Sequence, residues 1–87
     1  MNGALLTRLT AHATLMLRRR GLAWLWVKDT LCAPTFERLD ERDSSLILAF
    51  KQIPEAEDKW LRVVYRMDNK THLVVTAFFD RNQEKRK

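Results

Sequence analysis

Residues 60–80, WLRVVYRMDNKTHLVVTAFFD, decide the fold of this 87-residue chain. Apolar and polar side chains alternate along both halves of the stretch, which is the period of a half-buried β-strand. Between the halves, Asp68-Asn69-Lys70 has the composition of a tight turn, because asparagine tolerates the positive φ that hairpin turns require. The sequence therefore predicts two antiparallel strands, from Trp60 to Met67 and from His72 to Asp80.

The alternation also assigns side chains to the two faces of this hairpin. The more apolar face, which we expect to pack on helices, carries Leu61, Val63, Tyr65, Met67, Leu73, Val75, Ala77 and Phe79. The opposite face carries Arg62, Arg66, His72 and Thr76 among Trp60, Val64, Val74 and Phe78. Basic side chains between aromatic ones are typical of surfaces that hold single-stranded nucleic acid. A sheet face that only meets solvent has a similar composition, so both interpretations stand.

Two helices are predicted upstream of the hairpin. Thr10 is a suitable N-cap for a helix over residues 11–20, and Gly21 suits the left-handed position after its last residue. A second helix is expected over residues 24–32, with Trp24, Val27 and Leu31 as its buried stripe, and Ala33-Pro34 ends it. Two helices joined at Gly21 also suggest a DNA-binding helix-turn-helix. Its second helix would expose mainly Leu25, Trp26 and Lys28, which are poor groups for contacting base edges.

Two further strands are expected, over residues 35–41 and 46–53, and the acidic loop 55–58 follows the second. Residues 4–9 are compatible with an edge strand, a frayed first turn or a docked leader, and residues 82–87 form a charged tail. The predicted fold class is α+β, with two N-terminal helices packed on a three- to four-stranded antiparallel sheet. The whole chain, 1–87, forms a single domain.

The composition limits the classes of function. With 16 Lys and Arg against 11 Asp and Glu, the net charge of +5 favours a polyanionic partner. The single cysteine, Cys32, excludes an internal disulfide and fits the cytoplasm. With His12 and His72 it forms no metal-ligand spacing, so neither a metal nor another cofactor is expected. No apolar run approaches the roughly 20 residues of a membrane helix, and no signal peptide is recognisable.

Several short motifs resemble a bacterial family catalogued only as a domain of unknown function and related to the RelE/BrnT-type toxin superfamily. The opening Thr10-Ala11-His12-Ala13, followed by Arg20-Gly21-Leu22, resembles the family pattern T-x-H-A-x-x-R-M-x-x-R-G-I. The similarity continues through Ala33-Pro34 and resumes at residues 50–53, 61–65 and 74–81, so that it covers about residues 10–81.

The resemblance implies a RelE-like fold and a toxin-like domain that binds RNA, in some members ribosome-bound mRNA, and is held inactive by an antitoxin protein. Superfamily members are metal-independent ribonucleases in which the RNA 2′-hydroxyl attacks the adjacent phosphate. Basic side chains stabilise the charge that develops on that phosphate. The catalytic residues that the resemblance implies are His12 for proton transfer and Lys51 and Arg62 as phosphate clamps. Arg20, Thr76 and Arg81 would bind RNA.

One position departs from the family pattern, because Met16 stands where an arginine commonly follows the motif histidine by one helical turn. If that arginine takes part in cleavage, this chain would bind RNA without cutting it. A second function is compatible with the same surface, namely a non-catalytic interaction module that holds an acidic protein on the basic face of the sheet.

Overall fold

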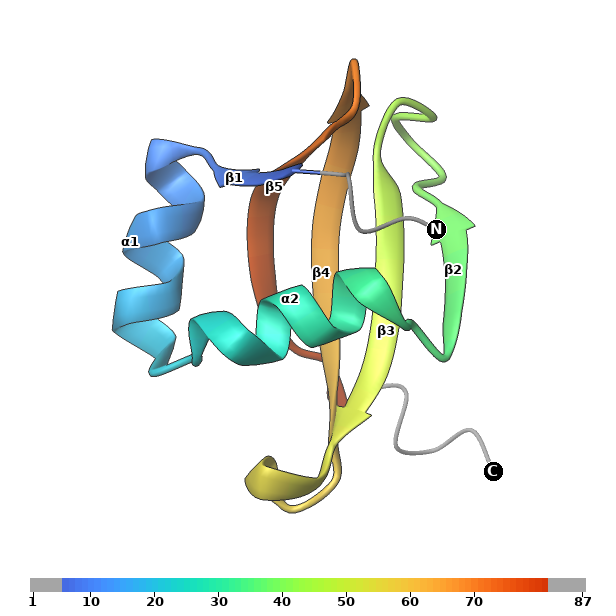
Figure 1. The fold of residues 1–87 in the computed structure, drawn as a ribbon. Helices are drawn as coiled ribbons and strands as arrows, with labels where there is room; N and C mark the ends of the chain where they lie inside the picture. Colours follow the sequence, from blue (N-terminus) through green and yellow to red (C-terminus); the bar gives the residue numbers. More distant parts are fainter. Residues whose placement is uncertain (1–5, 82–87) are drawn as a thin grey trace.

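A computed structural model describes residues 6–81 as a mixed five-stranded sheet with two α-helices (Figure 1). The strands are β1 (Leu6–Leu9), β2 (Phe36–Leu39), β3 (Ile47–Ile53), β4 (Lys59–Asp68) and β5 (Thr71–Phe79). The helices are α1 (Ala11–Arg20) and α2 (Trp24–Cys32), and a 3₁₀ turn, η1, spans Pro54–Ala56. Within the sheet the order is β1-β5-β4-β3-β2.

The predicted α+β class is confirmed, but the predicted three- to four-stranded antiparallel sheet is wrong. The strands β2 to β5 pair in antiparallel fashion, and β1 adds a fifth strand that runs parallel to β5, with Leu6 opposite Thr71. Of the alternatives for residues 4–9, the edge strand is the one observed, over Leu6–Leu9. Residues 1–5 and the predicted tail, 82–87, lie outside the described part of the chain.

Local sequence signals explain the boundaries of α1. The Thr10 side chain accepts a hydrogen bond from the Ala13 amide at 3.0 Å, which satisfies a first-turn donor with no helical partner. At the other end, Gly21 adopts φ 63° and donates its backbone N–H to Arg18 O. A left-handed glycine ends a helix without the strain that a Cβ would add.

The helices cover the sheet in different ways. α2 lies across one face, whereas α1 runs beside β5 where β1 has ended (Figure 1). The Thr10 amide donates to Val74 O at 3.0 Å, so α1 starts against the free edge of β5. On α2, Val27 and Leu31 are buried as predicted, but the expected burial of Trp24 is wrong, because its side chain is 39% exposed.

A β-bulge in β5 changes which side chains share a face. Tyr65 pairs with Val74 and Val64 pairs with Thr76, which leaves Val75 as an extra residue without a partner on β4. Val74 consequently packs in the core beneath the helices, while Val75 packs on the opposite face. The prediction that His72 shares a face with Arg62 is therefore wrong, and so are the predicted helix-side positions of Leu73 and Val75.

Both faces of the sheet carry apolar clusters. The larger one lies between helices and sheet and includes Val27, Leu31, Leu61, Val63 and Ala77. The smaller one, on the far face, is built on Leu48, Phe50 and Val64, with Phe36 and Trp60 packed against it. Phe50 is fully buried although neither α1 nor α2 covers this face, because side chains from the neighbouring strands lie over it.

Candidate functional site: a cationic pocket at the end of β5

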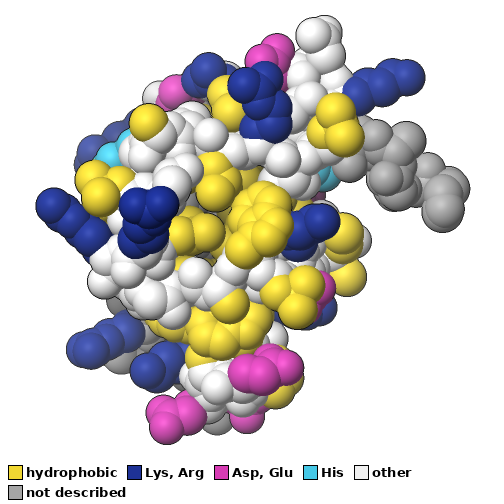
Figure 2. Space-filling view, turned by 60° about the vertical axis from the view of Figure 1, so that its left-hand side comes forward, with side chains coloured by type: hydrophobic (Ala, Val, Ile, Leu, Met, Phe, Trp, Pro, Cys, Tyr) yellow, Lys and Arg dark blue, Asp and Glu magenta, His cyan; other side chains and the backbone are white. Residues whose placement is uncertain are grey.

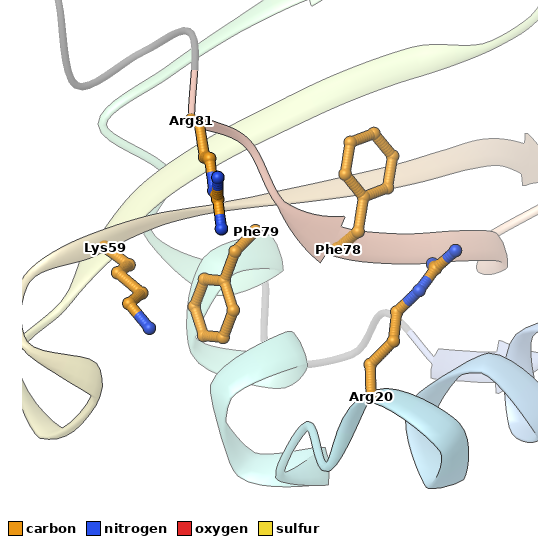
Figure 3. A pocket seen from close by; sticks show the side chains of 5 residues that line it. All are labelled: Arg20, Lys59, Phe78, Phe79 and Arg81. Atoms are coloured by element: carbon orange, nitrogen blue, oxygen red, sulfur yellow. The ribbon is translucent and has the colours of Figure 1, made fainter.

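An open pocket of about 390 Å³ lies where β5 ends, beside the last turn of α1 (Figure 3). It is lined by Arg20, Lys59, Phe78, Phe79 and Arg81. In Figure 3 the Lys59 and Arg81 side chains lie beside Phe79, and Arg20 extends from α1 toward Phe78. No carboxylate is among these lining residues, so the described walls of the pocket carry positive charge only.

Three separate elements bring the cations together. Arg20 comes from the C-terminal turn of α1, Lys59 begins β4, and Arg81 follows the end of β5. The antiparallel register pairs Leu61 with Phe79 and so places the start of β4 next to the end of β5. Arginine in the last turn of a helix is favourable, because it faces the negative end of the helix dipole.

Hydrogen bonds and aromatic contacts hold two of the pocket cations, Arg20 and Lys59, in place. Arg20 Nη1 donates to Ala77 O at 2.7 Å and to Thr76 Oγ1 at 3.4 Å, and its guanidinium lies 5.6 Å from the centroid of Phe78. Lys59 Nζ lies 5.7 Å from the centroid of Phe79. These are cation–π distances, at which a ring face attracts the charge without neutralising it. Arg20 and Lys59 are therefore positioned and still able to bind an anion.

Arg62 lies against Phe78, which lines the pocket, and has a different environment from the pocket cations. Its guanidinium is 5.2 Å from the Phe50 centroid and 5.1 Å from the Phe78 centroid, and its Nη2 forms an ion pair with Asp80 Oδ2 at 2.7 Å. The two side chains are 21% and 5% exposed, and the buried Arg62 Nε has no hydrogen-bond partner. Asp80 offsets the charge of Arg62, so Arg62 is less available to an anion than the pocket cations are. Its contact with Phe78 supports that wall of the pocket.

The six site residues predicted from sequence separate into two groups in the structure. Arg20 and Arg81 line the pocket, and Thr76 lies next to it as an acceptor for Arg20. His12 is exposed in the first turn of α1, about 12 Å along the helix axis from Arg20 at 1.5 Å per residue. Neither His12 nor the other two predicted catalytic residues, Lys51 and Arg62, is among the lining residues.

Lys51 lies on the helix side of the sheet, away from Arg62. Its partner on β4 is Leu61, which belongs to the core beneath the helices, whereas Arg62 pairs with Phe50 on the far face. Lys51 Nζ donates to Ala33 O at 2.9 Å, at the residue that caps the C-terminus of α2. The observed contact of Lys51 is thus with a helix end.

Sequence reasoning missed Lys59 and Phe79 as site residues. Phe79 was assigned to the core, against which it does pack, but it also lines the pocket. Lys59 comes one residue before the strand predicted from Trp60. Its position near Arg81 follows only from the register between β4 and β5, which the sequence does not give.

A separate group of titratable side chains lies on the helix side of the sheet. Tyr65 Oη donates to Glu37 Oε2 at 2.8 Å, and the rings of Tyr65 and His72 meet edge to face at 4.9 Å. Burial, together with the Glu37 hydrogen bond, raises the pKa of Tyr65, since both disfavour the phenolate. Burial lowers the pKa of His72, and the Glu37 charge opposes that shift. These groups reinforce contacts among β2, β4 and β5.

Within residues 6–81, no three His, Cys, Asp or Glu side chains are grouped so that they could hold a metal ion. The described helices are also too short, or insufficiently apolar, to cross a membrane.

Fold and site together define a small α+β domain with an aromatic, cationic pocket. Residues 9–79 match the family described as Domain of unknown function (DUF4258), and the chain belongs to that family. This confirms the expected membership of a domain-of-unknown-function family. No curated protein and no solved structure matches the chain.

Proposed function

We propose that this protein is an RNA-binding domain that holds the phosphates of single-stranded RNA in the pocket at the end of β5. The observation that carries the proposal is the convergence of Arg20, Lys59 and Arg81 around two phenylalanine rings, with no acidic side chain in the described lining. Basic groups beside aromatic rings suit a flexible strand, which offers phosphates and unstacked bases together.

The arrangement of α2 favours a single-stranded ligand over duplex DNA. A recognition helix must project polar side chains into the major groove. Here α2 lies across the sheet and exposes Trp24 and Leu25, with Lys28 stacked over the Trp24 ring at 5.9 Å. The helix-turn-helix alternative therefore lacks a suitable surface.

The motif resemblance, through a family that we relate to RelE/BrnT-type toxins, favours RNA as the ligand. It also adds an antitoxin partner and RNA cleavage to the proposal. For cleavage, a general acid or base must lie within reach of the reacting phosphate. The described lining of the pocket contains no imidazole or carboxylate, and Met16 replaces the motif arginine. We propose RNA binding as the basal activity. Cleavage would in addition require a proton-transfer group, either His12 or a group supplied by the ribosome.

Salt-dependent binding tests the proposal. A fluorescein-labelled single-stranded RNA is titrated by anisotropy over a range of salt concentrations. If the three pocket cations neutralise three phosphates, the plot of log K against log salt has a slope of about −2, since each contact to a single strand contributes about −0.7. Lys59→Ala and Arg81→Ala should each weaken binding and reduce the slope by about 0.7.

The matched control is Arg42→Ala, which removes an exposed arginine from the connection between β2 and β3. It should leave both affinity and slope close to those of the parent protein. Binding that is independent of salt, or equal losses in Arg42→Ala and Lys59→Ala, would reject the pocket as the RNA site. Gel analysis of the same RNA with EDTA present, with and without His12→Ala, shows whether cleavage accompanies binding.

A further inference from the structure

The side of the molecule on which α1 and α2 lie carries an exposed apolar surface. Figure 2 shows hydrophobic side chains gathered at the centre of this side, with Lys and Arg side chains to either side of them. The exposed large hydrophobic residues on the two helices are Leu15, Trp24 and Leu25, whose exposures are 45%, 39% and 65%. We refer to these three residues as the helical apolar face.

Helix geometry explains why these side chains point outward. On α1 the buried positions are Ala13, Met16 and Leu17, so Leu15 lies on the other side of the helix. On α2 the buried positions are Val27, Thr30 and Leu31, which leaves Leu25 on the opposite side of the helix. Trp24 lies on the side of Val27 and Leu31, but it is the first residue of α2 and its side chain is 39% exposed. Leu15 and Leu25 therefore point away from the side on which their helices pack. Exposed apolar groups that gather into one patch, as Figure 2 shows on this side, commonly mark an interaction surface.

On α1 and α2 themselves, the charged residues near the helical apolar face are mainly positive. Arg18 and Arg19 follow Leu15 by three and four residues, so they lie one turn away on the same side of α1. Lys28 lies over the Trp24 ring at 5.9 Å. Asp29 is the acidic residue of α2.

We propose that the helical apolar face binds an acidic amphipathic segment of another protein. Apolar side chains of that segment would cover Leu15, Trp24 and Leu25, while its carboxylates would meet Arg18, Arg19 and Lys28. An amphipathic helix in which leucine and glutamate alternate with helical period meets both requirements. The proposal uses residues outside the pocket and is independent of RNA binding.

A second copy of this chain is the less favourable occupant. A symmetric dimer brings the same surface of both subunits together, so a patch that carries Arg18, Arg19 and Lys28 would face a second patch of the same positive charge. The net charge of +5 adds to this repulsion. An acidic partner turns the same charges into attraction, which raises both specificity and the rate of association.

Two designed peptides test the proposal with the full chain. The first is a fluorescein-labelled helical peptide of about 18 residues, with leucine at helical spacing on one face and glutamate elsewhere. The second has lysine in place of every glutamate. We expect the glutamate peptide to bind at least about tenfold more tightly than the lysine peptide, and Leu25→Asp to weaken its binding by a similar factor or more.

Leu15→Asp is the second variant, and Leu39→Asp is the matched control, since Leu39 is 57% exposed on β2, outside the helices. All three replace exposed residues, and circular dichroism checks that each variant is folded. The glutamate peptide should bind to Leu39→Asp as it does to the parent protein. Lack of binding, equal affinity for both peptides, or equal losses in Leu39→Asp and Leu25→Asp would overturn the proposal.

Two further measurements distinguish other occupants of the helical apolar face. Light scattering after size-exclusion chromatography would show a dimer that Leu25→Asp abolishes if the occupant is a second copy. Sedimentation with anionic phospholipid vesicles would show binding that Leu25→Asp abolishes if the occupant is a membrane surface. Either result overturns the proposal, whereas a monomer that does not sediment with vesicles and prefers the glutamate peptide supports it.

Discussion

Replacing Asp80 with asparagine should strongly destabilise the fold, because it removes the charge opposite Arg62. The Arg62 side chain is 21% exposed, and its buried Nε already lacks a hydrogen-bond partner. Loss of one partner from a buried ion pair typically costs about 3–5 kcal/mol, and the partial exposure of Arg62 places the expected cost near about 3 kcal/mol. A chain of this length has a total stability of about 4–13 kcal/mol.

At about 4–8 °C per kcal/mol for a small domain, the Asp80→Asn variant should melt about 12–24 °C below the parent protein. Guanidinium denaturation followed by circular dichroism measures the free energy of unfolding directly. As a control, Arg66→Ala replaces an exposed residue on β4, the strand that carries Arg62. It should change the free energy of unfolding by no more than about 0.5 kcal/mol. Replacing both partners, as in Arg62→Met with Asp80→Leu, should cost less than Asp80→Asn alone. A loss below about 1 kcal/mol for Asp80→Asn would refute the reasoning.

Three further predictions concern single residues. Gly21→Ala should destabilise by about 1 kcal/mol in chemical denaturation, because a Cβ there meets no atom within 4 Å but φ is +63°. Lys51→Met should lose about 0.5–1.5 kcal/mol with its bond to Ala33 O and leave RNA affinity in the anisotropy assay unchanged. The lowered pKa of His72 means that the unfolded chain binds its proton first as pH falls, so stability should decrease below about pH 6.5. In melting curves across pH, His72→Gln should flatten this decrease.

The helices could be predicted because their boundaries depend on neighbouring residues. Thr10 and Gly21 supply hydrogen bonds to unpaired backbone groups at the two ends of α1, and these bonds involve only nearby residues. The second helix, α2, occupies Trp24–Cys32 as expected. The hairpin turn at Asn69, whose φ is 61°, is equally local. By contrast, β1 pairs with a strand more than sixty residues away, and nothing in Leu6–Leu9 itself distinguishes a strand from a frayed helical turn.

The bulge could not be predicted because Val74 and Val75 are interchangeable by composition. Either valine can pack in a core, so strict alternation placed Val75 beneath the helices, whereas the structure places Val74 there. At the bulge, Val74 O and Val75 O both accept hydrogen bonds from Thr10, the N-cap of α1, and alternation along one strand carries no information on such a distant contact. The prediction for His72 failed for the same reason, since every residue between the bulge and the turn changes face.

The same bulge determines which residues form the candidate site. In a regular hairpin from the Asn69 turn, Arg62 would oppose Ala77, and Lys59 would oppose Asp80. The extra residue shifts the register by one, so that Arg62 opposes Phe78 and lies within ion-pair distance of Asp80. It also brings Lys59 beside Phe79 and leaves Phe78 to face Arg20. The pocket therefore depends on one unpaired valine, and this explains why Arg20 and Arg81 could be predicted from motifs while their neighbours Lys59 and Phe79 required the strand register.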